Sequence, residues 1–194
     1  MNLLYRMTIA MIPLGIPLMS AANEPLRNTA AISAAITEES SRREVLPLID
    51  KVRRATGRFR DINVAMAEGW VQGTPCVSGP NSGAMGVHFV IPRRIGDGQL
   101  NADEPEALIY EPLPNGTFRL VGVEFIVLAA DWTRLHPAGP APSLEGNLLN
   151  LIGEPNRYGL PAFFEMHVWA WERNPNGSYA DWNSHVTCDR QVIN

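Results

Sequence analysis

Apolar residues between positions 45 and 66 recur at the three- and four-residue spacing of an amphipathic helix, with arginine and aspartate opposite them. Pro47 fits only the first turn of such a helix, because proline lacks the N–H that later turns need. Gly57 weakens the middle by roughly 1 kcal/mol relative to alanine, and Gly69 is a natural stop. The apolar stripe consists of Val45, Leu48, Ile49, Val52, Phe59, Ile62 and Met66. A helix with one such stripe must bury it against other elements.

The later apolar segments are short and rich in branched and aromatic residues, which predicts β-strands. The pairs Asn115-Gly116 and Asn176-Gly177 lie between such segments and predict hairpin turns. Residues 131–161 are rich in proline and glycine and have the character of a lid or binding loop. The expected strands are 86–91, 107–111, 118–128, 163–171 and a short one within 178–188. This order predicts an α+β fold, with the N-terminal amphipathic helix packed on a curved antiparallel sheet or a small barrel.

Each of the four longer strands has one plain apolar face and one face with ionisable residues, since successive side chains alternate across a strand. In the strand 118–128, the apolar face begins at Val121 and the other face at Leu120. The neighbours of the ionisable residues include Ile109, Ile126 and Trp169, a composition that differs from that of a solvated face. If the strands are adjacent, the second face gathers His88, Glu111, Glu124, Glu165 and His167.

Two histidines and a carboxylate are the minimum set for a catalytic zinc, copper, iron or manganese site. We therefore expect His88, Glu124 and His167 to bind a divalent transition metal ion. Glu111 or Glu165 would then orient a ligand or act as a catalytic general base. No H-x-H or HExxH motif supports this spacing. In the alternative interpretation, both histidines belong to the core and are paired with Glu124 and Glu165.

Three functions fit these residues. The first is an exported metal-binding or metal-dependent protein with a His/Glu site on one sheet face. The second is an extracytoplasmic binding module for a small molecule, with a pocket lined by tryptophan. The third is a metal-free enzyme that uses a Glu/His acid–base pair. Each function implies a small molecule or a metal ion as the partner.

The first 22 residues have the pattern of a secretory signal peptide. Arg6 precedes an apolar run that Pro13 and Pro17 would prevent from forming a spanning helix. Small residues at 20–22 favour cleavage before Asn23. We expect a signal peptide over 1–22, a polar and partly disordered lead over 23–43, and a single α+β domain over 44–194.

Charge and cysteine content narrow the location and the partners. The net charge is -4, and Lys51 is the single lysine of the sequence, so a nucleic-acid partner is not expected. No segment after the signal has the length and apolarity of a membrane span, so no membrane association is expected once the signal is removed. Cys76 and Cys188 are the two cysteines, and in an oxidising compartment they predict a disulfide. The expected location is therefore the periplasm or the exterior.

Several strings resemble those of an uncharacterised group of exported bacterial proteins. They are GAMGVHFV (83–90), EALIYEP (106–112), VGVEFIV (121–127) and MHVWAWERNPNG (166–177), which follow a helix ending in RDINVAMAEGW. The resemblance covers most of the mature chain and implies a bacterial, extracytoplasmic protein with no known activity.

Overall fold

The computed structural model of the protein describes residue 32, residues 47–79 and residues 81–190. The signal peptide expected over 1–22 lies outside the described residues, as does the lead over 23–43 apart from Ile32. No helix within the described ranges is long and apolar enough to cross a membrane. The described residues 47–79 and 81–190 belong to one compact unit.

The expected N-terminal helix is divided into three short helical segments around Gly57. They are α2 (Pro47–Thr56), the 3-10 helix η1 (Gly57–Arg60) and α3 (Ile62–Ala67). Pro47 is the first residue of α2, as expected for a residue without a backbone N–H. The helical conformation resumes after Asp61, whose carboxylate accepts the N–H of Asn63 at 2.9 Å and caps α3. Leu48, Val52 and Phe59 of the apolar stripe belong to the main core, whereas Met66 at its end is exposed.

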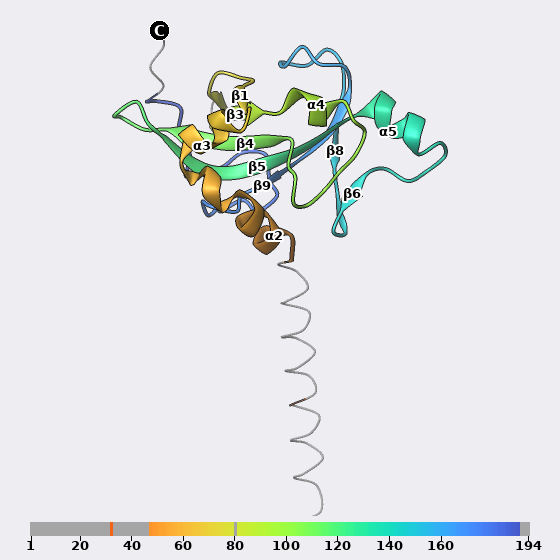
Figure 1. The fold of residues 1–194 in the computed structure, drawn as a ribbon, viewed down its shortest axis with the longest axis horizontal. Helices are drawn as coiled ribbons and strands as arrows, with labels where there is room; N and C mark the ends of the chain where they lie inside the picture. Colours follow the sequence, from red (N-terminus) through yellow and green to blue (C-terminus); the bar gives the residue numbers. More distant parts are fainter. Residues whose placement is uncertain (1–31, 33–46, 80, 191–194) are drawn as a thin grey trace, which may run out of the picture. The chain divides into compact units, whose positions relative to one another are not determined.

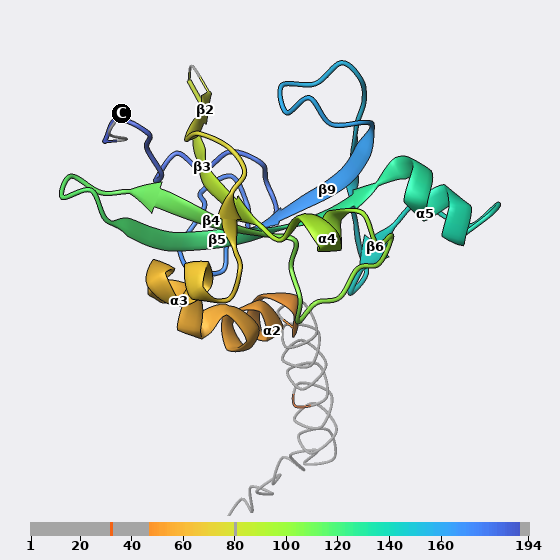
Figure 2. The same cartoon turned by 45° about the horizontal axis from the view of Figure 1, so that its top comes forward.

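Within the described residues, seven strands form one antiparallel sheet in the order β1-β3-β4-β5-β9-β8, with β2 paired to β3 beside this path. The sheet is open, since β1 and β8 lie at its two ends, so the curved sheet is confirmed and the barrel is not formed. The strand bounds are β1 (Val71–Gln72), β2 (Val77–Gly79), β3 (Gly83–Val90), β4 (Ala107–Pro112), β5 (Phe118–Leu128), β8 (Asn150–Ile152) and β9 (Phe163–Val168). Figures 1 and 2 show α2 and α3 on one side of β4 and β5.

The remaining elements lie in the connections. α4 (Pro92–Ile95) follows β3, and α5 (Ala129–Leu135) follows β5. The proline-rich connection expected to be irregular contains a small hairpin, β6 (Ser143–Leu144) and β7 (Asn147–Leu148), and then the edge strand β8.

A β-bulge in β5 changes the expected assignment of one residue to a face. Tyr110 of β4 pairs with Leu120, whereas Ile109 pairs with Gly122, so Val121 is the extra residue. Leu120 consequently joins the main core, while Val121 packs with Ile109 on the opposite face. The predicted assignment of residues to the apolar face of β5 is therefore wrong for Leu120 and Val121 and correct from Val123 onward.

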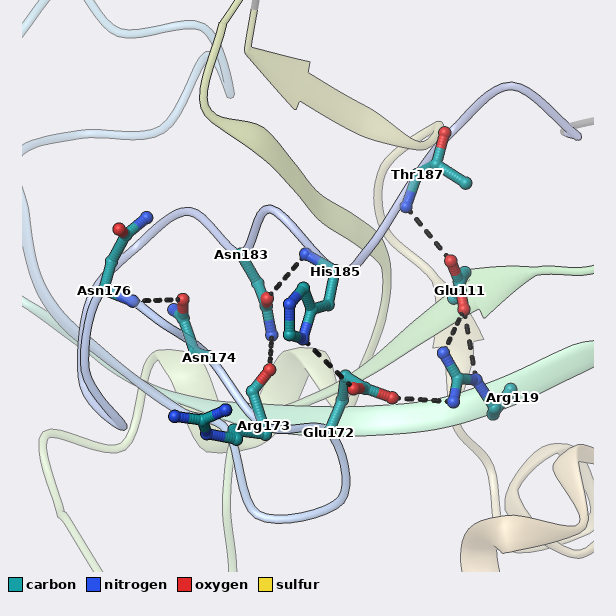
Figure 3. Close-up of polar contacts among 9 residues, drawn as sticks. All are labelled: Glu111, Arg119, Glu172, Arg173, Asn174, Asn176, Asn183, His185 and Thr187. Atoms are coloured by element: carbon teal, nitrogen blue, oxygen red, sulfur yellow. Dashed lines mark hydrogen bonds and ion pairs between the residues drawn. The ribbon is translucent and has the colours of Figure 1, made fainter.

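The C-terminal segment does not form the strand expected within 178–188. Asparagine side chains bind the backbone there. Asn174 donates to the Trp182 carbonyl at 2.9 Å. Asn183 accepts the His185 N–H at 2.9 Å, as Figure 3 shows. Such local bonds replace a β-ladder and leave an isolated bridge between Ala84 and Asn183. The segment therefore covers part of the second sheet face as a series of turns, with Val186 packed in the cluster that contains Ile109 and Val121.

The predicted Cys76–Cys188 disulfide is formed, with a Cα–Cα distance of 5.6 Å across a sequence separation of 112. It joins the loop before β2 to the C-terminal segment. This covalent tie holds the segment against the second sheet face, near which the ionisable residues lie.

Candidate metal centre

Three strands of the sheet place His88, Glu124 and His167 on the second face. His88 lies in β3, Glu124 in β5 and His167 in β9, and Glu124 is directly opposite His167 in the ladder. β4 separates β3 from β5, so these two strands are about 10 Å apart. In β4 the residue opposite Glu124 is Ala107 and the residue opposite His88 is Ile109, so these two side chains approach each other diagonally across β4.

All three side chains are almost completely buried, with 1 to 4% of their surface exposed. The Nε2 atom of His88 lies 3.3 Å from Oε2 of Glu124. The imidazole rings of His88 and His167 meet edge to face, with their centroids 5.8 Å apart and their planes at 86°. One potential ligand atom from each of the three residues lies within 4.8 Å of the other two. The set could therefore hold a metal ion.

The outer nitrogen of each imidazole has a hydrogen-bond partner. Nδ1 of His167 lies 2.9 Å from Oε2 of Glu165, and Nδ1 of His88 lies 3.1 Å from the hydroxyl oxygen of Thr74. In metal sites, a ligand histidine generally donates its second N–H to a carboxylate or another oxygen in this way. The inner Nε2 atoms of both histidines have no hydrogen-bond partner and are buried, as is one oxygen of Glu165, among the described residues.

Burial dominates the electrostatics of the site. It lowers the pKa of His88 to about 3, with help from the charge of His167, so this imidazole is neutral at pH 7. Burial also raises the pKa of Glu124 to about 7, although His167 opposes that change. For His167, burial alone would lower the pKa, but Glu124, Glu165 and Asp181 together raise it. The 3.3 Å contact between His88 and Glu124 is consequently not an ion pair, because its histidine carries no charge.

A second group of possible ligands overlaps the first. Glu165, His167 and Asp181 also bring one ligand atom each within 4.8 Å of the others. Asp181 is half-buried in the segment after β9, and burial followed by the charge of Glu165 raises its pKa. The hydrogen bond between His167 and Glu165 occupies the Nδ1 atom, whereas Nε2 is unpaired. The geometry therefore favours His88, Glu124 and His167 as the metal ligands. Glu165 and Asp181 would then lie behind His167 and not bind the ion.

A pocket of about 140 Å³ is lined by two residues of this cluster, His88 and Glu124. Thr74 and Tyr158 are its other polar side chains. Two residues of the long connection, Tyr158 and Leu160, form part of its wall. The apolar wall comprises Val90, Ile95, Ile126, Tyr158, Leu160 and Phe163. The aromatic residues of this pocket are tyrosine and phenylalanine rather than the tryptophan that the sequence predicts.

The two tryptophans that follow β9 have other contacts. Trp169 stacks on His167 with 6.0 Å between ring centroids, and its indole N–H donates to the Ala180 carbonyl. Trp171 donates its indole N–H to the Thr56 hydroxyl at 3.2 Å. Trp169 thus packs directly against His167, and Trp171 connects α2 to the segment after β9.

Glu111 lies apart from the three proposed ligands. It is four residues along β4 from Ala107, or about 13 Å at the rise of a strand. Its Oε2 accepts two hydrogen bonds from Arg119, at 2.6 and 3.1 Å, and its Oε1 accepts the Thr187 N–H at 3.1 Å (Figure 3). Oε2 of Glu172 accepts a hydrogen bond from Nη1 of Arg119 at 2.7 Å. Glu111 therefore anchors the C-terminal segment to the sheet, and these contacts give it no link to the histidines.

Several residues around the site were absent from the sequence-based prediction. Phe163 shares the parity of Glu165 and His167 in β9, so strand alternation could have indicated it. Thr74 and Asp181 lie in loops, whose placement no periodicity reveals.

Glu106 is a further buried carboxyl group that the sequence analysis did not single out. Its Oε2 accepts the Ile126 N–H at 2.9 Å. Burial raises its pKa to about 9, so it is protonated at pH 7.

Comparison with known proteins gives no functional assignment, so any assignment depends on the geometry of the site. No protein-family model, curated protein or solved structure matches the chain. The resemblance to exported bacterial proteins therefore stays a prediction.

Proposed function

We propose that this protein is an exported metal-binding protein, in which His88, Glu124 and His167 hold one divalent transition metal ion. The observation that carries the proposal is the pair of inner Nε2 atoms, which are buried without a partner beside a carboxylate oxygen. An unsatisfied buried polar atom costs about 1 to 3 kcal/mol, and this site contains two such nitrogens. A cation between them would remove both penalties.

The outer contacts support the same proposal. The bond from His167 to Glu165 has the arrangement of a carboxylate–histidine–metal triad, which directs the Nε2 lone pair inward. Two imidazoles and one carboxylate suit zinc, iron, manganese or copper. A metal with three protein ligands keeps a further position, which here would face the pocket, and would act there as a Lewis acid.

Export is the second part of the proposal. The Cys76–Cys188 disulfide supports an oxidising compartment, such as the periplasm or the exterior. The signal-peptide pattern at the N-terminus supports the same location.

A direct test is elemental analysis of the protein purified from its own compartment without an affinity tag, followed by zinc titration of the metal-free form. We expect about one transition metal ion per chain and a zinc affinity in the micromolar range or tighter. His88→Ala and His167→Ala should each abolish retention of the ion. His136→Ala and His185→Ala are matched controls, because both histidines are exposed, and they should retain it. Metal-free native protein that binds no zinc would refute the proposal.

One observation favours a second function, acid–base catalysis without a metal. Glu124 lines the pocket, and its pKa of about 7 suits a group that exchanges protons near neutral pH. The neutral His88 beside it could accept or donate a hydrogen bond to a substrate. The elemental analysis separates the two functions, because acid–base catalysis of this kind persists in protein extracted with a chelator.

A further inference from the structure

The pocket beside the proposed ligands also indicates what reaches the metal. Its wall is apolar where β3, β5, β9, α4 and the loop before β9 contribute to it, and the ionisable groups among its lining residues that could meet a metal are His88 and Glu124. The hydroxyls of the two other polar side chains in the lining are already engaged, that of Thr74 with His88 and that of Tyr158 with the Met85 sulfur. A ligand that fits must therefore have an apolar body and a single polar group at one end.

The volume limits the size of that body. Engineered apolar cavities of about 150 Å³ hold benzene. The present pocket of about 140 Å³ consequently suits a body of roughly one six-membered ring or a branched chain of similar bulk. Phe163 and Tyr158 offer ring faces and edges for such a body, with their own centroids 5.8 Å apart at 71°.

Charge identifies the polar group. Two neutral imidazoles and one carboxylate leave one positive charge on a divalent cation itself, and Glu165 and Asp181 offset it only from behind His167, outside the set of ligands. The remaining positive charge at the ion favours an anionic donor at the open position. In the metal-free protein the same end of the pocket presents Glu124, and its wall contains no lysine or arginine. An anion would therefore bind there only together with the metal.

We propose that the pocket binds a small carboxylic acid with an apolar body of about six carbons, whose carboxylate completes the coordination of the metal held by His88, Glu124 and His167. This proposal rests on the proposed metal site. A neighbouring groove shares Gly73, Thr74 and Tyr158 with the pocket and also contains Arg157.

Isothermal titration with benzoate as the probe tests this proposal on the full mature protein, in zinc-loaded and chelator-treated forms. Benzoate should bind the zinc form at least about 10-fold more tightly than acetate, because the ring buries apolar surface that acetate lacks. The chelator-treated form should bind benzoate at least about 10-fold more weakly than the zinc form. Benzyl alcohol has the same ring without the anion, and it should show no such dependence on zinc.

Two variants test the location. Leu160→Trp fills the pocket from a half-buried position and should abolish benzoate binding while zinc affinity is unchanged. Leu148→Trp is the control, because Leu148 is 70% exposed on β7, and it should change neither affinity. If Leu160→Trp fails to fold, Ile95→Trp narrows the pocket from α4 and carries the same expectation.

The outcomes separate this proposal from the one it rests on. Zinc binding without benzoate binding overturns the ligand assignment and leaves the metal site in place. Equal benzoate affinity with and without zinc also overturns it, since the carboxylate would then lie elsewhere, for example at Arg157. Absence of zinc binding overturns both proposals together.

Discussion

Replacement of Glu124 by glutamine should have opposite effects on stability with and without metal. Glu124 is buried, and its pKa is raised from 4.5 to about 7, chiefly by desolvation. A difference of this size corresponds to about 3 kcal/mol between the protonation states in the folded protein. The ionised carboxylate is therefore a destabilising group in the metal-free fold, and glutamine removes that charge while it retains the shape.

The sign and the pH window follow from linkage. Because the folded pKa is the higher one, Glu124 contributes stability below its unfolded pKa of 4.5, and this contribution is lost as pH rises through about 7. Glu124→Gln should therefore stabilise the metal-free protein by about 3 kcal/mol at pH 8 and by only about 1 kcal/mol at pH 5. For a chain of this size, the larger value raises the melting temperature by about 6 to 12 °C.

Zinc should reverse the order of stability. A metal present at 1,000 times its dissociation constant stabilises the wild-type fold by about 4.1 kcal/mol, which exceeds the advantage of about 3 kcal/mol that the variant has without metal at pH 8. The variant without the carboxylate ligand should lose most of this gain. The assay is urea denaturation at pH 5 and pH 8, with EDTA and with zinc. Glu172→Gln removes a partly exposed carboxylate and serves as the control. A metal-free Glu124→Gln protein that is less stable than wild type at pH 8 would refute the argument.

Four other predictions concern residues around the site and the two ends of the chain. Glu165→Gln should weaken zinc affinity by about 10- to 100-fold by removing the carboxylate that orients His167, and an unchanged affinity in calorimetry would contradict the triad. Glu111→Gln should destabilise the fold by about 1 to 3 kcal/mol and leave zinc affinity unchanged, so a 10-fold loss of zinc binding would place Glu111 in the site after all. Reduction of Cys76–Cys188 should lower the free energy of unfolding by up to about 5 kcal/mol, measured by urea titration with and without dithiothreitol. N-terminal sequencing of the exported protein should begin at or near Asn23, whereas an intact Met1 would argue against the signal peptide.

The candidate cluster was predictable because strand alternation is a local property. His88, Glu124 and His167 each lie in a strand whose apolar positions are two residues apart, so parity alone assigned them to one face. Their convergence also needed the strand order β3-β4-β5-β9, in which only β4 and β5 are joined by a short hairpin loop. The diagonal approach of His88 and Glu124 across β4 becomes visible only once the register is known.

The features that sequence analysis missed depend on contacts between distant segments. The bulge at Val121 receives the N–H groups of Trp171 and Glu172 at its carbonyl oxygen, at 3.1 and 3.0 Å, and no local pattern announces those donors. The expected strand within 178–188 has adequate strand formers, but the side chains of Asn174 and Asn183 bind the backbone instead. Gly83 adds to this arrangement, because a Cβ atom there would lie 2.1 Å from the Asn183 carbonyl oxygen.

The position of β4 between the strands that carry His88 and Glu124 has a consequence for the motions of the sheet. An ion held by both residues and by His167 would tie β3, β5 and β9 together across β4, so that β4 could not separate from either neighbour without release of the ion. The amide hydrogens of β4 should then exchange with solvent only through the global unfolding of the metal-loaded protein. In the metal-free protein they should exchange through smaller local openings, so the exchange rates of this one strand report whether the site is filled.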